Sequence, residues 1–206
     1  MHKLAQFPRS PLRVFSRSML LELRSIFSDV YAQAHTTCYE SHKAPSARDL
    51  LPHKRKALID DRLKEFADRS GIQAKYAKNS IKNCSHIELY TSDACFVTCY
   101  VASRSERPRT KFRDLLAQSN YLVFPGLENV PAPFNREFIE ILHGPSGRSL
   151  DELGFIQFVK PTADMTGDIW AKDIDKLLTT NIVAREEIVD NAPVRLRRNA
   201  RAIKED

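Results

Sequence analysis

Residues 138–161 read FIEILHGPSGRSLDELGFIQFVKP, and this stretch decides the fold class of the chain. Two apolar runs, at about 137–143 and 153–159, flank a centre that contains glycines, a proline and serines. Turns between β-strands use these residue types, because glycine permits unusual backbone angles and proline and serine favour chain reversal. The pattern therefore predicts a β-hairpin. Alternation along its first strand gives two faces, with Ile139 and Ile141 on one and Phe138, Glu140 and Leu142 on the other.

The connector of this hairpin does not match the common catalytic or phosphate-binding patterns. Its segment HGPSGR lacks the GxxxxGK(S/T) spacing of a phosphate-binding loop, and it leads into a strand rather than into a helix. The chain also lacks a GxSxG nucleophile elbow. We interpret the hairpin as sheet scaffold, in which His143 and Arg148 are the groups that could take part in function.

A metal-dependent nuclease or hydrolase built on this hairpin is an alternative hypothesis. Many metal-dependent nucleases place an acid on one strand and Glu/Gln-x-Lys on the next, so that the last two side chains share a face. Here Asp151 precedes Gln157 and Lys160, and the spacing is Gln-x-x-Lys. On a regular strand, that spacing puts Gln157 and Lys160 on opposite faces.

A zinc site is a further possibility, because four borderline or soft ligands occur within sixteen residues: Cys84, His86, Cys95 and Cys99. Zinc needs four side chains that converge on one point. Cys95 and Cys99, however, lie about 13 Å apart on one predicted strand, given the usual rise per residue. Buried free cysteines on a core face fit the pattern better. The sequence therefore predicts no metal, no cofactor and no catalytic residue.

The rest of the chain predicts an α+β fold, because helical patterns and hairpins are segregated along the sequence. We expect N-terminal helices packed on a small, mostly antiparallel sheet of two β-hairpins, with a closing C-terminal helix. The predicted single domain covers 1–190, with a helical part at about 11–83 and a hairpin part at about 86–180, and a basic flexible tail follows at 191–206. The predicted elements are helices at about 11–34, 55–68, 72–83, 112–118 and 169–178, a polar connector at 36–46, and a first hairpin of strands 86–90 and 95–102.

Composition places the protein among ordinary globular chains. The 206 residues carry a formal net charge of +6, and four cysteines occur without a CxxC pair. A basic balance favours acidic partners such as nucleic acid, and sparse cysteines favour a reducing compartment. No apolar run approaches the roughly 18 residues that a bilayer span requires. We therefore expect a cytoplasmic protein that does not contact a membrane.

The segment LKEFADRSGIQAKYAKNSIKN, 63–83, resembles a helix-turn-helix over about 20 residues. Ala67 lies four residues before Gly71, where a small residue would let two helices cross closely and a glycine would permit the turn. The match is incomplete, because Ser70 stands where an apolar residue is usual. From Leu51 to Asn83 the chain has nine Lys/Arg against four Asp/Glu.

We therefore predict a non-catalytic regulatory protein that contacts DNA or RNA through this basic segment. Lys and Arg would neutralise phosphates, and Gln and Asn would contact phosphates or base edges. The arginines near the C-terminus would form a flexible second anchor. The predicted contact residues are Lys64, Arg69, Gln73, Lys75, Lys78, Asn79, Lys82, Arg195, Arg197 and Arg198.

An alternative of another class is a protein that inhibits a partner, such as a prophage or toxin–antitoxin component. The segment NYLVF, 120–124, is similar to the glutamine-led peptides ending in Leu-Phe that bind the bacterial replication sliding clamp. Asn120 stands in place of glutamine and Val123 in place of leucine. The resemblance implies a partner contact through Asn120, Tyr121, Leu122 and Phe124, and an acidic protein or an antitoxin remains a possible partner.

Overall fold

The computed structural model describes residues 14–79, 84–102, 108, 110–120, 136–147 and 149–180. It consists mainly of a six-stranded sheet and two long helices. The strands lie side by side in the order β1-β2-β3-β4-β5-β6. In chain order, the elements are α1 (Arg17–Ser41), α2 (Ala44–Ser70), β1 (Gln73–Lys78), β2 (Ser85–Tyr90), β3 (Ala94–Tyr100), α3 (Lys111–Ala117), the 3-10 turn η2 (Gln118–Asn120), β4 (Glu137–Ser146), β5 (Ser149–Pro161) and β6 (Asp168–Asp173). Residues 174–180 are helical.

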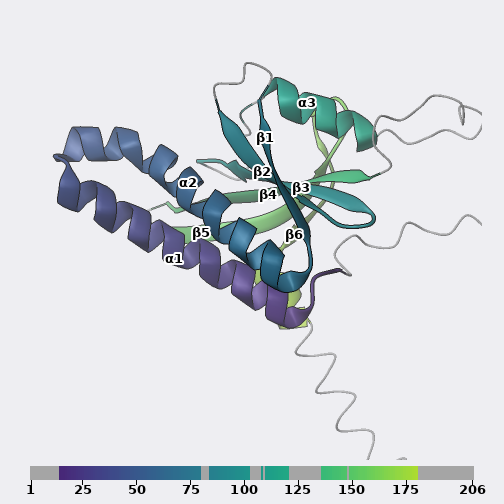
Figure 1. Ribbon diagram of the computed structural model, residues 1–206, viewed down its shortest axis with the longest axis horizontal. Helices are drawn as coiled ribbons and strands as arrows, with labels where there is room; N and C mark the ends of the chain where they lie inside the picture. The colour runs from purple at the N-terminus through teal and green to yellow at the C-terminus, as the bar shows by residue number, and fades with distance from the viewer. Residues whose placement is uncertain are drawn as a thin grey trace, which may run out of the picture.

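Two antiparallel meanders, β1-β2-β3 and β4-β5-β6, meet at the one parallel pair that the described strands form, β3 with β4. A parallel pair needs a crossover connection, and α3 lies in that crossover. Phe96 and Ile139 point into the core beneath α1 and α2. Their sequence neighbours Cys95 and Phe138 point the other way and contact α3 through Ala117. The helices therefore cover opposite faces of the sheet (Figure 1).

Three aromatic rings join α1's N-terminal end to the sheet. The ring centroid of Phe15 lies 5.2 Å from that of Phe96 and 5.1 Å from that of Phe158. All three side chains are buried in the main hydrophobic core. The burial of large aromatic rings contributes much of the energy that holds a helix onto a sheet.

The α+β class, the N-terminal helices, the closing helix and both predicted hairpins are confirmed. β2 pairs with β3, and β4 pairs with β5, each in antiparallel register. The predicted faces of β4 are also confirmed, since Ile139 and Ile141 lie in the main core and Phe138 and Leu142 lie in clusters on the other face. The sheet is nevertheless larger than two hairpins, because β1 and β6 extend it at both edges.

The predicted helix at 72–83 is wrong over Gln73–Lys78, which form strand β1, and the helix-turn-helix geometry is therefore absent there. Gly71 ends α2 with a left-handed φ of 69°. The next residue, Ile72, is buried in the core, which redirects the chain onto the edge of β2. Six register pairs with β2 then outweigh the helical preference of Lys and Ala, as tertiary context often does. Residues 80–83 lie outside the described part.

Of the helix predicted at about 11–34, residues 11–13 lie outside the described part, and α1 begins at Arg17. The predicted connector at 36–46 is mostly helical. Ser16 caps α1 by accepting a hydrogen bond from the Met19 amide at 3.2 Å. The helix continues to Ser41. It does so because Ala34 and Cys38 pack against Ala47 and Leu51 of α2 in a small separate cluster.

The helix predicted at 169–178 is wrong in its first part, because Asp168–Asp173 form the edge strand β6. The helical residues begin only at Ile174. The Asp173 carboxylate marks this boundary, since its Oδ1 atom accepts a hydrogen bond from the Asp175 amide at 3.0 Å. The predicted basic tail at 191–206 lies outside the described residues.

Two glycines of the β4–β5 hairpin provide a matched stability test. A Cβ atom added at Gly144 would lie 2.5 Å from both Phe155 Cε1 and the Val101 carbonyl oxygen, whereas one added at Gly147 meets no described atom within 4 Å. We expect Gly144→Ala to lower the free energy of unfolding by about 1–3 kcal/mol because of overpacking. Gly147→Ala should leave it nearly unchanged. Urea unfolding followed by circular dichroism measures both, and equal effects would contradict the hairpin geometry.

Candidate functional site

Several of the predicted nucleic-acid contacts are engaged with neighbouring acids. Lys64 forms an ion pair with Asp68, and Arg69 pairs with Glu22 of α1 at 2.5 Å. Each partner carboxylate offsets the charge that a phosphate would bind. These two cations therefore serve the helix surface and the contact between α1 and α2 in this structure.

The predicted contacts that follow α2 lie on and beside an edge strand instead of a second helix. Gln73, Lys75 and Lys78 are exposed on β1, and Lys75 stands opposite Glu88 of β2. Asn79 follows the strand, and its backbone N–H donates a hydrogen bond to the Cys84 carbonyl at 2.9 Å. The remaining predicted contacts lie outside the described residues: Lys82, Arg195, Arg197 and Arg198.

Exposed cations that pair with no described acid lie instead at the N-cap of α2 and along its N-terminal half, next to the end of α1. We call the exposed residues His42, Lys43, Arg48 and Lys54 the basic turn. No described acid forms an ion pair with Lys43, Arg48 or Lys54. The connection between α1 and α2 lies beyond the sheet, so that the helical hairpin projects from the body of the molecule (Figure 1).

The charge is unevenly distributed along α2 and its N-terminal flank. Residues 41–58 contain five Lys/Arg and one Asp, whereas residues 59–70 contain three Lys/Arg and four Asp/Glu. Counting the net charge in these narrower windows would have found the basic turn. The prediction over 51–83 missed it because that window begins after His42, Lys43 and Arg48 and includes cations that are paired with acids.

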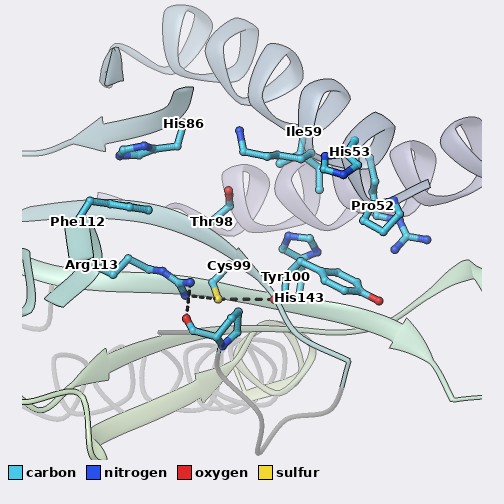
Figure 2. Close-up of a pocket in the computed structure, with 13 residues that line it drawn as sticks. Pro52, His53, Ile59, His86, Thr98, Cys99, Tyr100, Phe112, Arg113 and His143 are labelled. Atoms are coloured by element: carbon cyan, nitrogen blue, oxygen red, sulfur yellow. Dashed lines mark hydrogen bonds between the residues drawn. The ribbon is translucent and has the colours of Figure 1, made fainter. Parts of the chain in front are cut away.

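A pocket of about 330 Å³ lies between α2, the sheet and α3. It exists because β2 and β3 separate: Glu88–Tyr90 pair with Cys95–Val97, and these three pairs are the whole register between the two strands. Beyond them, no described strand pairs with Thr98–Tyr100 on the β2 side. Figure 2 shows His86 and Phe112 at one end of the pocket and Tyr100 and Pro52 at the other.

Ring contacts and hydrogen bonds order one end of this pocket. The imidazole of His86 stacks on Phe112 with ring centroids 4.0 Å apart, and its Nε2 atom lies 3.1 Å from Glu88 Oε1. Burial by itself would raise the pKa of Glu88, but hydrogen bonds from His86 and Tyr90 outweigh it and lower the pKa. Glu88 is therefore an ionised acceptor that fixes the orientation of the His86 ring.

The floor of the pocket contains a buried arginine from α3. The Arg113 guanidinium donates to Cys99 Sγ, to Glu140 Oε1 at 3.2 Å and to the Pro108 carbonyl. Glu140 is completely buried on β4 and compensates the charge of Arg113. This network ties α3 to the sheet.

The other side of the floor joins α1, α2 and β4. His143 is 3% exposed, and its Nδ1 atom lies 3.0 Å from the Tyr31 hydroxyl. The guanidinium carbon of Arg55 lies 3.9 Å from the centroid of the Tyr31 ring. Burial, assisted by the nearby Arg55 charge, lowers the pKa of His143 to about 3. The imidazole is therefore neutral at physiological pH. The hairpin histidine noted from sequence lies in this pocket, whereas Arg148 lies outside the described residues.

The first residue of the predicted clamp-binding segment is turned into the protein. Asn120 is 5% exposed, and its amide nitrogen donates to the carbonyls of Phe138 and Pro161 at 2.9 and 3.0 Å. Its amide oxygen accepts from the Phe138 amide at 2.8 Å. Asn120 thus joins η2 to the ends of β4 and β5. Tyr121, Leu122 and Phe124 lie outside the described residues, and their contact with a partner stays a prediction.

The described part of the structure contains no cluster of ligands that would support the predicted alternatives of a zinc site or a metal-dependent nuclease. Among the described residues, no three His, Cys, Asp or Glu side chains come together in a way that could hold a metal ion. Lys160 pairs with Glu137 at 3.0 Å. Within the same described residues, no helix has the length and apolar character that crossing a membrane requires.

Comparison with protein-family models, with curated proteins and with solved structures gives no match for this chain. The function must therefore be inferred from the geometry and charge of its own residues.

The buried His143 makes the stability of the protein depend on pH. Its pKa falls from 6.5 to about 3 on folding, so below pH 6.5 the unfolded chain takes up a proton that the folded protein does not. Stability is therefore lost as the pH falls, by up to about 1.4 kcal/mol per pH unit.

We expect His143→Gln to reduce this loss, because glutamine does not titrate and can still bond to Tyr31. Between pH 6.5 and pH 5, the wild type should lose about 1–2 kcal/mol more than the variant. Urea unfolding across this range measures the difference. Parallel curves for the two proteins would show that His143 does not titrate as its burial requires.

Proposed function

We propose that this protein is a non-enzymatic, cytoplasmic regulatory protein that binds the phosphate backbone of DNA or RNA through the basic turn. The observation that carries the proposal is the set of exposed cations Lys43, Arg48 and Lys54, which have no ion-pair partner among the described residues. Like charges held near one another on a folded protein repel, and an oppositely charged partner or counterions reduce this electrostatic cost. Nucleic acid provides a regular array of such charges.

The shape of the helical hairpin supports the same proposal. Its tip has its own small core of Ala34, Cys38, Ala47 and Leu51. That core allows the basic turn to project beyond the sheet without losing its packing. A projecting helix pair can approach a duplex or a folded RNA without a clash from the sheet. The proposal concerns phosphate contact and implies no particular base sequence.

The first test compares two triple variants on one helix that carry the same change in charge. The variant Lys43→Ala/Arg48→Ala/Lys54→Ala removes the basic turn, and the variant Arg62→Ala/Lys64→Ala/Arg69→Ala removes three cations that are paired with acids. We expect the first to weaken binding to a duplex of about 20 base pairs and to reduce the slope of log K against log salt by roughly 2–3. Fluorescence anisotropy from about 50 to 200 mM salt measures both quantities.

The matched variant should retain most of the wild-type affinity and slope. Equal weakening by both variants would show that net charge alone is responsible, which contradicts a site at the basic turn. A loss confined to Lys75→Ala/Lys78→Ala would place the contact on β1 instead. Absence of wild-type binding to duplex DNA, single-stranded DNA and structured RNA at low salt would overturn the proposal.

A pulldown separates nucleic acid from a protein partner. If the captured partners disappear after nuclease treatment, the result fits the proposal. If a discrete protein is still captured after nuclease treatment, the partner is an acidic protein or an antitoxin. If capture of that protein is lost on Phe124→Ala, the contact lies in the segment that resembles clamp-binding peptides.

A further inference from the structure

Arg55 is a buried cation that no acid of the described residues pairs with. Its side chain is only 2% exposed, and no described carboxylate forms an ion pair with it. One terminal nitrogen donates to the Leu150 carbonyl at 2.6 Å. The guanidinium carbon lies 3.9 Å from the centroid of the Tyr31 ring and 5.5 Å from that of Tyr100. The Nε atom has no hydrogen-bond partner among the described residues.

Such an arrangement is costly for the protein alone. Arginine keeps its charge under all physiological conditions, and a buried charge is ordinarily paired with an opposite charge. Aromatic faces and one carbonyl compensate the guanidinium only in part. The other buried arginine of the pocket, Arg113, shows the usual solution, since it pairs with the buried Glu140. No acid of the described residues gives Arg55 such an internal counter-ion.

Arg55 lines the pocket between α2, the sheet and α3. We propose that this pocket binds a small planar organic anion, whose acidic group pairs with Arg55 and whose ring occupies the space between the aromatic walls. The protein would thus take its missing counter-ion from a ligand. The proposal does not depend on nucleic-acid binding, because Arg55 is not part of the basic turn.

The walls of the pocket favour a flat apolar body over a simple inorganic ion. Rings or proline surfaces stand at both ends, with His86 and Phe112 facing Tyr100 and Pro52 along the length of the cavity (Figure 2). A volume of about 330 Å³ exceeds what one inorganic anion fills and lies within the range of small-molecule sites. A fused two-ring acid matches both the size and the shape.

The charged lining residues other than Arg55 are already engaged. Lys56 donates to Asp60 at 2.6 Å and to the Ser85 carbonyl. Arg113 is paired with Glu140, and His143 is neutral because of its burial. Arg55 is therefore the cation of the pocket lining that no described carboxylate pairs with. Pro52, His53 and Lys56 are exposed at the rim, which gives a ligand a route from solvent.

Binding of three related probes to the wild-type chain tests the chemistry of the ligand. Naphthoate carries a carboxylate on a fused ring, naphthyl phosphate carries a phosphate on the same ring, and naphthamide is the uncharged analogue. We expect naphthoate or naphthyl phosphate to bind at least about tenfold more tightly than naphthamide, because only the acids can pair with Arg55. Isothermal titration calorimetry measures the three affinities. The stronger of the two acids identifies the anionic group that the site prefers.

Two variants with the same change in charge locate the site. Arg55→Met keeps a long apolar side chain and removes the unpaired charge, so it should fold at least as well as the wild type and bind the preferred acid about ten- to a hundredfold more weakly. Arg62→Met makes the same change in charge at an exposed position of α2 that lies outside both the pocket and the basic turn, and should bind like the wild type.

Three results would overturn the proposal: no heat of binding for either acid, equal affinities for naphthoate and naphthamide, or undiminished binding by folded Arg55→Met. The comparison among the three probes uses only wild-type protein, so it decides the question even if Arg55→Met fails to fold.

Discussion

The parallel pairing of β3 with β4 is the constraint on which the rest of this structure depends. Two antiparallel meanders can be built from short turns, but a parallel joint between them requires the chain to cross the sheet. The crossing brings α3 to the face opposite α1 and α2, so both faces of the central strands are covered. Covered strands need apolar residues at successive positions. Cys95–Val97 and Phe138–Leu142 are accordingly buried without interruption, and the charged residue among them, Glu140, is compensated by Arg113.

The same joint creates the pocket. β3 is paired with β4 along its whole length, from Ala94 to Tyr100, but with β2 over only three residues. The sheet opens where β2 leaves β3, and residues from both faces reach the opening. Arg55 arrives from α2 and Arg113 from α3. The two arginines differ in one decisive respect, which is that Glu140 compensates Arg113 and no described acid compensates Arg55.

Helix α2 combines two different surfaces in one continuous element. Its C-terminal half packs on the sheet and balances its charges through ion pairs such as Lys64 with Asp68. Its N-terminal half packs mainly on α1 and leaves Lys43, Arg48 and Lys54 exposed. The pocket lies along the helix between these halves. A single continuous helix thus joins the surface that we propose for phosphate contact to the site that we propose for a small anion.

The sequence by itself determined the elements whose periodicity matches their final environment. The strand-like runs HIELY, 86–90, and CFVTCYVA, 95–102, predicted β2 and β3, and glycine and proline between apolar runs predicted the β4–β5 hairpin. It could not determine Gln73–Lys78 or Asp168–Asp173, because edge strands take their conformation from the neighbouring strand and their own residues favour helix or neither state. Nor could it distinguish Arg55 from the exposed cations beside it. The burial of Arg55 depends on the tertiary structure, because the groups around it come from segments far apart in the chain. Tyr31 belongs to α1 and the Leu150 carbonyl to β5, and the pocket beside Arg55 opens where β2 leaves β3.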